Sequence, residues 1–222
     1  LSVQDPHEVP PDAQEAARKK HLEWRHPRSD FLSLLNLWAR WQKWGDDSSN
    51  RQLRRLCREH FVSYLRMEEW EAVYKQIVDM VQGKNAVAQS TKSLDELYPQ
   101  IHKCLAAGLI DHIGLKQMEK PEFTGPRGRV FKIFPASALA KKPPQWIVSA
   151  QLAQTSQLFA RTNAAIEPDW LAEVAPHLVK RTLTTPLWNA DRGEVSCTEH
   201  QSLFGMQLLK RTRHFGSSEP VE

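Results

Sequence analysis

The chain has 222 residues, of which 41% are hydrophobic and 25% are charged, the balance of an ordinary globular protein. No apolar run approaches the ~18 residues that a membrane span needs, and no signal-peptide core is present. Its three cysteines, Cys57, Cys104 and Cys197, form no CxxC pair, which argues against a zinc site or a disulfide framework. We therefore expect a cytoplasmic protein without a membrane partner, and the initial Leu1 suggests a fragment of a longer one.

The net charge of +4 is unevenly distributed along the chain. Residues 1–111 hold 16 basic and 16 acidic side chains, whereas residues 112–222 hold 14 and 10. The change coincides with a change from helix-like to strand-like patterning, so two domains are expected.

The first half of the chain predicts a linker followed by a helical bundle. Residues 1–10 are polar and rich in proline, as linkers are. Residues 11–111 then carry apolar side chains at helical spacing, first after Pro11, next from a cap at Asp30, and most clearly over residues 70–81. None of these segments is apolar on every side, so they should pack together as a bundle.

Two features of this bundle allow a structural or a functional interpretation. The tryptophans Trp38, Trp41 and Trp44 could stack on bases, although aromatic residues at helical spacing usually belong to a core. The arginines between Arg51 and Arg58 could form a solvated helix face or contact phosphate. We retain Arg51 and Arg55 as candidate nucleic-acid contacts.

From His112 onwards the pattern becomes that of strands. Strands are expected at residues 113–117, 130–134, 146–152 and 157–164, with a GPRG turn before the second and a hairpin joining the last two. A short helix should begin at Pro168, and further strands are expected at Val179–Leu183 and Gly193–His200. Residues 210–222 form a basic tail or the start of a following region.

This second half also carries a basic candidate binding surface. Between His112 and Arg161 there are eight lysines and arginines against two acids, an imbalance that suits a phosphate backbone but also an idle solvated face. The alternation after Ser156 places Gln157, Phe159, Arg161 and Asn163 on one strand face. An aromatic ring flanked by an arginine and amides is what a stacking platform requires. Phe159 could instead be buried under a loop. The candidate nucleic-acid-binding residues here are Arg127, Arg129, Lys132, Lys141, Lys142, Thr155, Phe159 and Arg161.

Motifs for catalysis are missing from the chain. It contains no GxxxxGK followed by Ser or Thr and no Asp-Glu-Ala-His, which an ATPase needs to hold phosphates and Mg²⁺. The pair Glu167 and Asp169 flanks Pro168 and is better placed to cap a helix than to catalyse. We expect no catalytic residue and no metal site, so the chain should not hydrolyse ATP by itself.

Residues 131–171 nevertheless resemble a known family. The segment has a Pro-x-Ser at Pro135, a Trp-Ile-Val strand from Trp146, Thr155-Ser156, a strand ending in Arg161-Thr162, and Pro168-x-Trp-Leu. In this order and spacing these elements are similar to the OB-fold segment of DEAH-box RNA helicases, and the Lys-Lys-Pro-Pro at 141–144 is most like the bacterial HrpA type. The resemblance extends from the first residues to about Leu209.

The resemblance implies an α+β chain: a helical, ratchet-like helicase-associated domain at 11–111, and a five-stranded OB-fold barrel at 112–209 with a helix between its third and fourth strands. It implies an accessory part that grips single-stranded RNA beside motor domains of the same polypeptide, where ATP and Mg²⁺ would bind; no cofactor is expected in this chain. The alternative is a protein-docking module for an activator protein, with little RNA affinity of its own.

Overall fold

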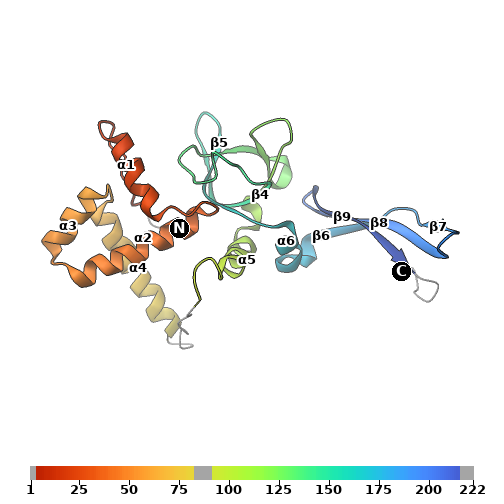
Figure 1. The fold of residues 1–222 in the computed structure, drawn as a ribbon, viewed down its shortest axis with the longest axis horizontal. Coiled ribbons are helices and arrows are strands. Elements are labelled where there is room, and N and C mark those ends of the chain that lie inside the picture. Colours follow the sequence, from red (N-terminus) through yellow and green to blue (C-terminus); the bar gives the residue numbers. More distant parts are fainter. Residues whose placement is uncertain (1–3, 83–91, 216–222) are drawn as a thin grey trace. The chain divides into compact units, whose positions relative to one another are not determined.

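The computed structural model describes residues 4–82 and 92–215. The chain divides into two compact units, with the boundary between Glu96 and Leu97. Each unit is described by itself (Figure 1). In the described residues the structure has six α-helices and a closed five-stranded barrel, which confirms the predicted α+β class. None of the described helices is long and apolar enough to cross a bilayer. Residues 83–92 have little apolar content, which predicts a loop that proteases cut early; almost all of them lie outside the described residues.

The first unit is a set of helices around an aromatic core. It contains α1 (Gln14–His21), α2 (Asp30–Asp47), α3 (Asn50–Glu59) and α4 (Tyr64–Gln82). The predicted cap at Asp30 is one residue off: the Ser29 side chain accepts from the Leu32 backbone N–H instead, because serine satisfies this free amide equally well. Trp41 is 3% exposed, and Trp38 and Trp44 pack against the same core, so the tryptophans are structural.

The expected linker packs on this helical unit. The backbone of His7 pairs with Val62 in an isolated β-bridge, and the Trp24 indole N–H donates to His7 Nε2 at 2.9 Å. The His7 and His21 rings lie 4.6 Å apart, and His21 Nε2 is 3.0 Å from the Phe61 carbonyl oxygen. Residues 4–10 therefore form part of the unit's structure.

This histidine pair predicts that the helical unit loses stability in mild acid. Burial, together with the charge of His7, lowers the pKa of His21 below its usual 6.5, so the unfolded chain takes up the proton more readily than the folded one. Stability should therefore fall as the pH drops from about 6.5. Urea unfolding between pH 5 and 8 should show a weaker pH dependence for His21→Gln than for the unmodified chain. His177→Gln, at an exposed position on the other unit, should keep the original dependence; an unchanged dependence in His21→Gln would contradict the prediction.

The second unit begins with α5 (Tyr98–Gly108) and continues into the barrel. Its strands are β1 (Ile113–Lys116), β2 (Phe123–Thr124), β3 (Val130–Ile133), β4 (Trp146–Gln154) and β5 (Leu158–Ala165). The order around the barrel is β1-β2-β3-β5-β4, closed by the antiparallel pairing of β1 with β4. Phe123, Phe131, Leu139, Ile147 and Ala160 fill its core.

The helix α5 lies with the barrel, although the sequence assigned it to the helical domain ending at residue 111. Its Tyr98 hydroxyl donates to the Ala165 carbonyl at 2.8 Å, and its Lys103 pairs with Glu173 on α6 (Pro168–Val174). The boundary between the two compact units thus lies between Glu96 and Leu97, before α5. The functional domain limits 11–111 and 112–209 remain predictions.

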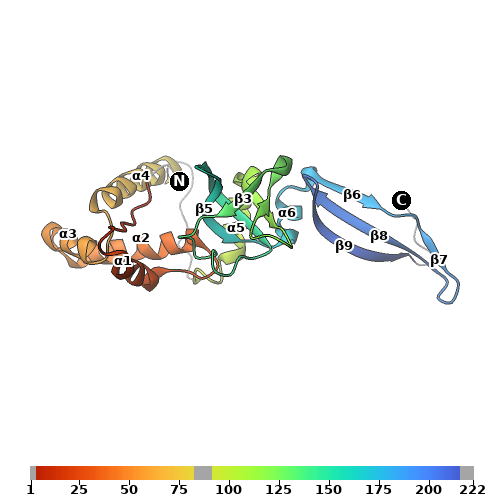
Figure 2. The same cartoon turned by 90° about the horizontal axis from the view of Figure 1, so that it is seen from above.

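The sequence predicted that the strands after α6 complete the barrel, and this prediction is wrong. All five barrel strands precede α6, including the two-residue β2, which was not foreseen. Because β3 and β5 pair with each other, the barrel has no free edge to which later strands could add. The strands β6 (Val179–Leu183), β7 (Leu187–Asn189), β8 (Glu194–Leu203) and β9 (Met206–Phe215) form a separate antiparallel sheet (Figure 2). Residues 210–215, expected to be a tail, belong to β9.

Candidate nucleic-acid interface

The parallel pairing of β3 with β5 brings a set of aromatic and basic side chains together. Lys132 lies beside Phe159 and Ile133 beside Ala160, and the Phe134 amide donates to the Ala160 carbonyl at 3.0 Å. Ile133 and Ala160 pack in the barrel core. By strand alternation their neighbours turn outward. We call this set the β3–β5 face: Lys132, Phe134, Phe159 and Arg161.

These four residues form a compact group rather than four separate contacts. The Phe134 and Phe159 rings meet edge to face, with centroids 5.9 Å apart, and the Arg161 guanidinium lies 4.4 Å from the Phe134 ring centre. Both phenylalanines are half-buried, so Phe159 is neither fully open nor fully buried, and the two alternatives for it remain. The cation–π contact keeps the guanidinium over the ring, and an arginine guanidinium is itself a surface on which a base can stack.

Phe134 was missed as a site residue in the sequence. It is the last residue of a predicted strand, and only its distance of two positions from Lys132 signals that both turn the same way. Its partner Phe159 comes from a strand 25 positions later, and the parallel pairing that joins them cannot be recognised from either segment alone.

Asn163 does not share the face of Phe159 and Arg161, contrary to the prediction. Ala160 and Asn163 are both fully buried although they lie three positions apart, so the alternation breaks between them. Thr162 has a φ of 53°, a left-handed conformation that twists the strand and resets its faces. The Asn163 side chain accepts from the Ser149 hydroxyl at 2.8 Å inside the fold, which is a structural role.

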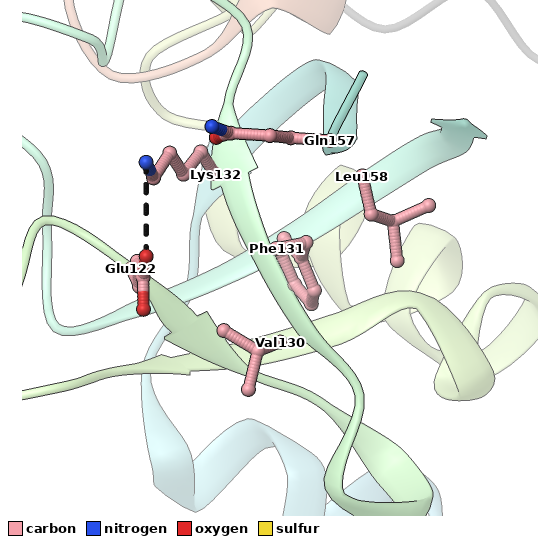
Figure 3. Close-up of a pocket in the computed structure, with 6 residues that line it drawn as sticks. All are labelled: Glu122, Val130, Phe131, Lys132, Gln157 and Leu158. Atoms are coloured by element: carbon pink, nitrogen blue, oxygen red, sulfur yellow. Dashed lines mark ion pairs between the residues drawn. The ribbon is translucent and has the colours of Figure 1, made fainter. Parts of the chain in front are cut away.

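A hollow of about 260 Å³ opens beside this face (Figure 3). Val130, Phe131 and Leu158 supply its apolar part, and Glu122, Lys132 and Gln157 its polar part. Lys132 Nζ lies 3.7 Å from Glu122 Oε1. Because both side chains are partly exposed, this ion pair is weak, and the lysine can exchange its carboxylate partner for a phosphate.

Arg127 and Arg129, by contrast, converge on Asp111. Arg127 Nη2 lies 3.1 Å from the Asp111 carboxylate, and Arg129 donates to the Asp111 backbone carbonyl. Asp111 neutralises part of this charge, and Arg129 also donates to the Pro126 carbonyl. These contacts give Arg129 a role in holding the turn before β3.

The remaining predicted residues are not members of the β3–β5 face. Lys141 and Lys142 are exposed on the loop between β3 and β4. The Thr155 hydroxyl donates to the Gln157 carbonyl and closes the β4–β5 turn. Arg51 and Arg55 are exposed on α3, in the other unit, where Arg55 pairs with Glu59 at 3.1 Å. Among the described residues, no three His, Cys, Asp or Glu side chains are grouped as a metal ion requires.

The barrel and its flanking helices correspond to a known fold class. Residues 101–178 match the family model described as the oligonucleotide/oligosaccharide-binding (OB)-fold. The match includes most of α5, all five barrel strands and α6, and ends just before β6. The predicted OB fold is therefore confirmed.

The whole chain is similar to one segment of larger helicases. It is 41% identical over 222 residues to the ATP-dependent RNA helicase HrpA homolog of Haemophilus influenzae, and 40% identical over 209 residues to ATP-dependent RNA helicase HrpA of Escherichia coli. It is 26% identical over 181 residues to the pre-mRNA-splicing factor ATP-dependent RNA helicase prp22 of Schizosaccharomyces pombe. These matches cover 100%, 94% and 81% of this chain. The predicted resemblance to helicases of the HrpA type is confirmed.

The chain spans 17%, 16% and 15% of the length of these three relatives. The similarity therefore concerns one segment of each of them.

Proposed function

We propose that this chain is the accessory, RNA-gripping part of an ATP-dependent RNA helicase, and that the barrel binds single-stranded RNA through its β3–β5 face. The observation that carries the proposal is the grouping of Lys132, Phe134, Phe159 and Arg161 on β5 and on β3 with the residue that follows it. OB folds hold single strands by combining basic side chains, which follow the backbone, with aromatic rings that stack on bases. The OB-fold family description and the printed names of the relatives support the same ligand.

The division of work follows from the residues present. Lys132 and Arg161 supply the charges for phosphates, and Phe159 and the Arg161–Phe134 stack supply flat surfaces for bases. Neither contact reads base edges, so binding should depend little on sequence. ATP and Mg²⁺ would bind in motor domains of the same polypeptide, in the cytoplasm. Lys141, Lys142, Thr155, Arg127, Arg129, Arg51 and Arg55 would add outlying contacts to the RNA backbone.

Salt dependence tests the proposal directly. Each phosphate contact on a single strand contributes about 0.7 to the slope of log K against log salt concentration. Lys132→Gln and Arg161→Gln should each lower the slope of oligo(U) binding by roughly that amount. The measurement is fluorescence anisotropy of a labelled 12-mer across a salt series.

Arg18→Gln provides the matched control, because it removes one exposed charge from α1 in the other unit. It should leave the slope nearly unchanged. If oligo(U) binding is undetectable at low salt, or all three variants behave alike, the RNA-gripping proposal fails. A protein-docking role, for example for an activator protein, would then be the better explanation.

A further inference from the structure

The sheet that follows the barrel lies outside the matched OB fold. It begins at Val179, one residue after the match ends. The strands β6 and β7 pair with opposite ends of β8 along one side, and β9 pairs with β8 along the other. Its residues 179–215 contain six lysines and arginines against three acids, so the sheet carries an excess of positive charge of its own.

The strand register gathers the aromatic residues and arginines of this sheet on one face. Trp188, Val195 and Phe215 lie side by side on three strands. Farther along the same face, Arg213 lies beside Cys197, Arg211 beside Glu199, and Arg181 beside Gln201. We call this the Trp188 face; its arginines and aromatic residues are Arg181, Arg211, Arg213, Trp188 and Phe215.

A buried carboxylate organises the arginines of this face. Glu199 is 2% exposed; it accepts from Arg211 Nε at 2.9 Å and from the Gln201 side chain at 2.8 Å. Arg213 Nε lies 3.8 Å from the same carboxylate, and its guanidinium lies 5.3 Å from the centre of the Phe215 ring. The arginine side chains nevertheless remain about half exposed. Glu199 thus holds these arginines in place while about half of each side chain stays accessible to a ligand.

Trp188 supplies an open stacking surface beside these arginines. It is 63% exposed, whereas Trp24, Trp41 and Trp146 are almost fully buried. Packing in the core therefore does not account for a tryptophan at this position. Exposed tryptophan beside arginine is the combination that stacks on unpaired bases and contacts their phosphates.

The charge of the Trp188 face favours a polyanion over a protein partner. Its one acid, Glu199, is buried beneath two arginines, and Glu194 on β8 is within ion-pair distance of Arg192 and His214. A protein partner would need its own cluster of acids to match this face, whereas every single-stranded nucleic acid carries regularly spaced phosphates.

We propose that the Trp188 face is a second binding surface for single-stranded nucleic acid, separate from the barrel, with Trp188 stacking on a base and Arg181, Arg211 and Arg213 contacting the backbone. Arg211 and Arg213 are ligand contacts, and Glu199 is a positioning residue. The inference uses none of the residues of the β3–β5 face, although it extends the proposed function to a second part of the chain.

The test uses the full chain and a fluorescein-labelled oligo(U) 24-mer. Trp188→Ala should lower the affinity about 5- to 150-fold with little change in salt slope, as the loss of one stacked base does, and Trp188→Phe should restore most of it. The double variant Arg181→Gln/Arg213→Gln should lower the salt slope by about 1.4, twice the single-strand value. This pair leaves Arg211 on Glu199, so the buried carboxylate keeps its closest cation, and thermal melts confirm the fold.

Lys180→Gln/Lys210→Gln removes the same charge from the opposite face of the same sheet and is the matched control. Its slope should fall by much less than 1.4. Equal losses in the two doubles, or unchanged binding in Trp188→Ala with an intact melt, would overturn the inference. In the unmodified chain, RNA that contains 4-thiouridine should also cross-link to residues 187–192.

Phe159→Ala, measured in parallel, separates this inference from the proposed function. If Phe159→Ala loses affinity and the Trp188 variants do not, only the binding role proposed for the Trp188 face is contradicted. Loss in the Trp188 variants alone would support this face and contradict the barrel site. An absence of binding by the unmodified chain would refute both.

Discussion

Gly114→Ala should destabilise the barrel unit by about 1–3 kcal/mol, the usual cost of forcing extra volume into a packed core. A Cβ at this position would lie 2.5 Å from the tip of the Phe131 ring and 3.2 Å from the Phe123 Cβ. Both rings are at most 2% exposed and stack with centroids 6.0 Å apart, so neither can move aside without disturbing the core. We expect the loss at the upper end of the range, measured as a fall in the urea midpoint.

Gly108→Ala is the control in the same unit. It is the last residue of α5, and a Cβ there would meet nothing within 4 Å. Alanine costs less entropy than glycine in a helix, so this variant should be neutral or more stable by up to about 1 kcal/mol. Equal effects of the two substitutions would mean that the Phe131 ring is not fixed by its packing.

The second large effect concerns RNA binding by the aromatic pair of the barrel. Phe159→Ala and Phe134→Ala should each weaken oligo(U) binding by about 1–3 kcal/mol, the value of one stacked base. Phe134→Ala should also lower the salt slope, because it removes the ring under Arg161 and frees that guanidinium to move. Phe159→Ala should leave the slope almost unchanged.

Phe159→Leu separates stacking from stability, since leucine keeps apolar volume but has no ring. It should bind as weakly as Phe159→Ala while melting closer to the unmodified chain. Phe204→Ala removes a partly exposed ring from the β8–β9 turn and should leave the affinity unchanged. If Phe159→Leu binds normally, Phe159 is a packing residue and the base stacks elsewhere.

The sequence predicted what depends on local patterning. The helices of the first unit, the long strands β4 and β5 and the short α6 all follow from periodicity and from Ser, Pro and Gly at their ends. The two-residue β2 could not be predicted, because two residues contain no period. The assignment of β6 and β8 to the barrel was wrong for a different reason: closure depends on β3 pairing with β5, a contact between residues 27 positions apart.

The candidate site divides in the same way. Lys132, Phe159 and Arg161 were predicted from residue type and strand alternation, and the structure brings them together. Phe134 was missed because its partners come from another strand. Asn163 was misplaced because one left-handed residue, Thr162, ends the alternation on which the prediction depended. The contacts of Asp111 with Arg127 and Arg129 could not be predicted, because they depend on how the turn before β3 is placed beside Asp111.

The contact between α5 and α6 has a mechanical consequence. The chain enters the barrel through α5 and leaves it through α6. These two helices pack against each other through Tyr98 and Trp170 and through Lys103 and Glu173. Tension along the polypeptide would therefore load this helix pair first, before it reached the hydrogen bonds between the barrel strands. A barrel mounted in this way can transmit force between its neighbours in the chain while its own β3–β5 face keeps its shape.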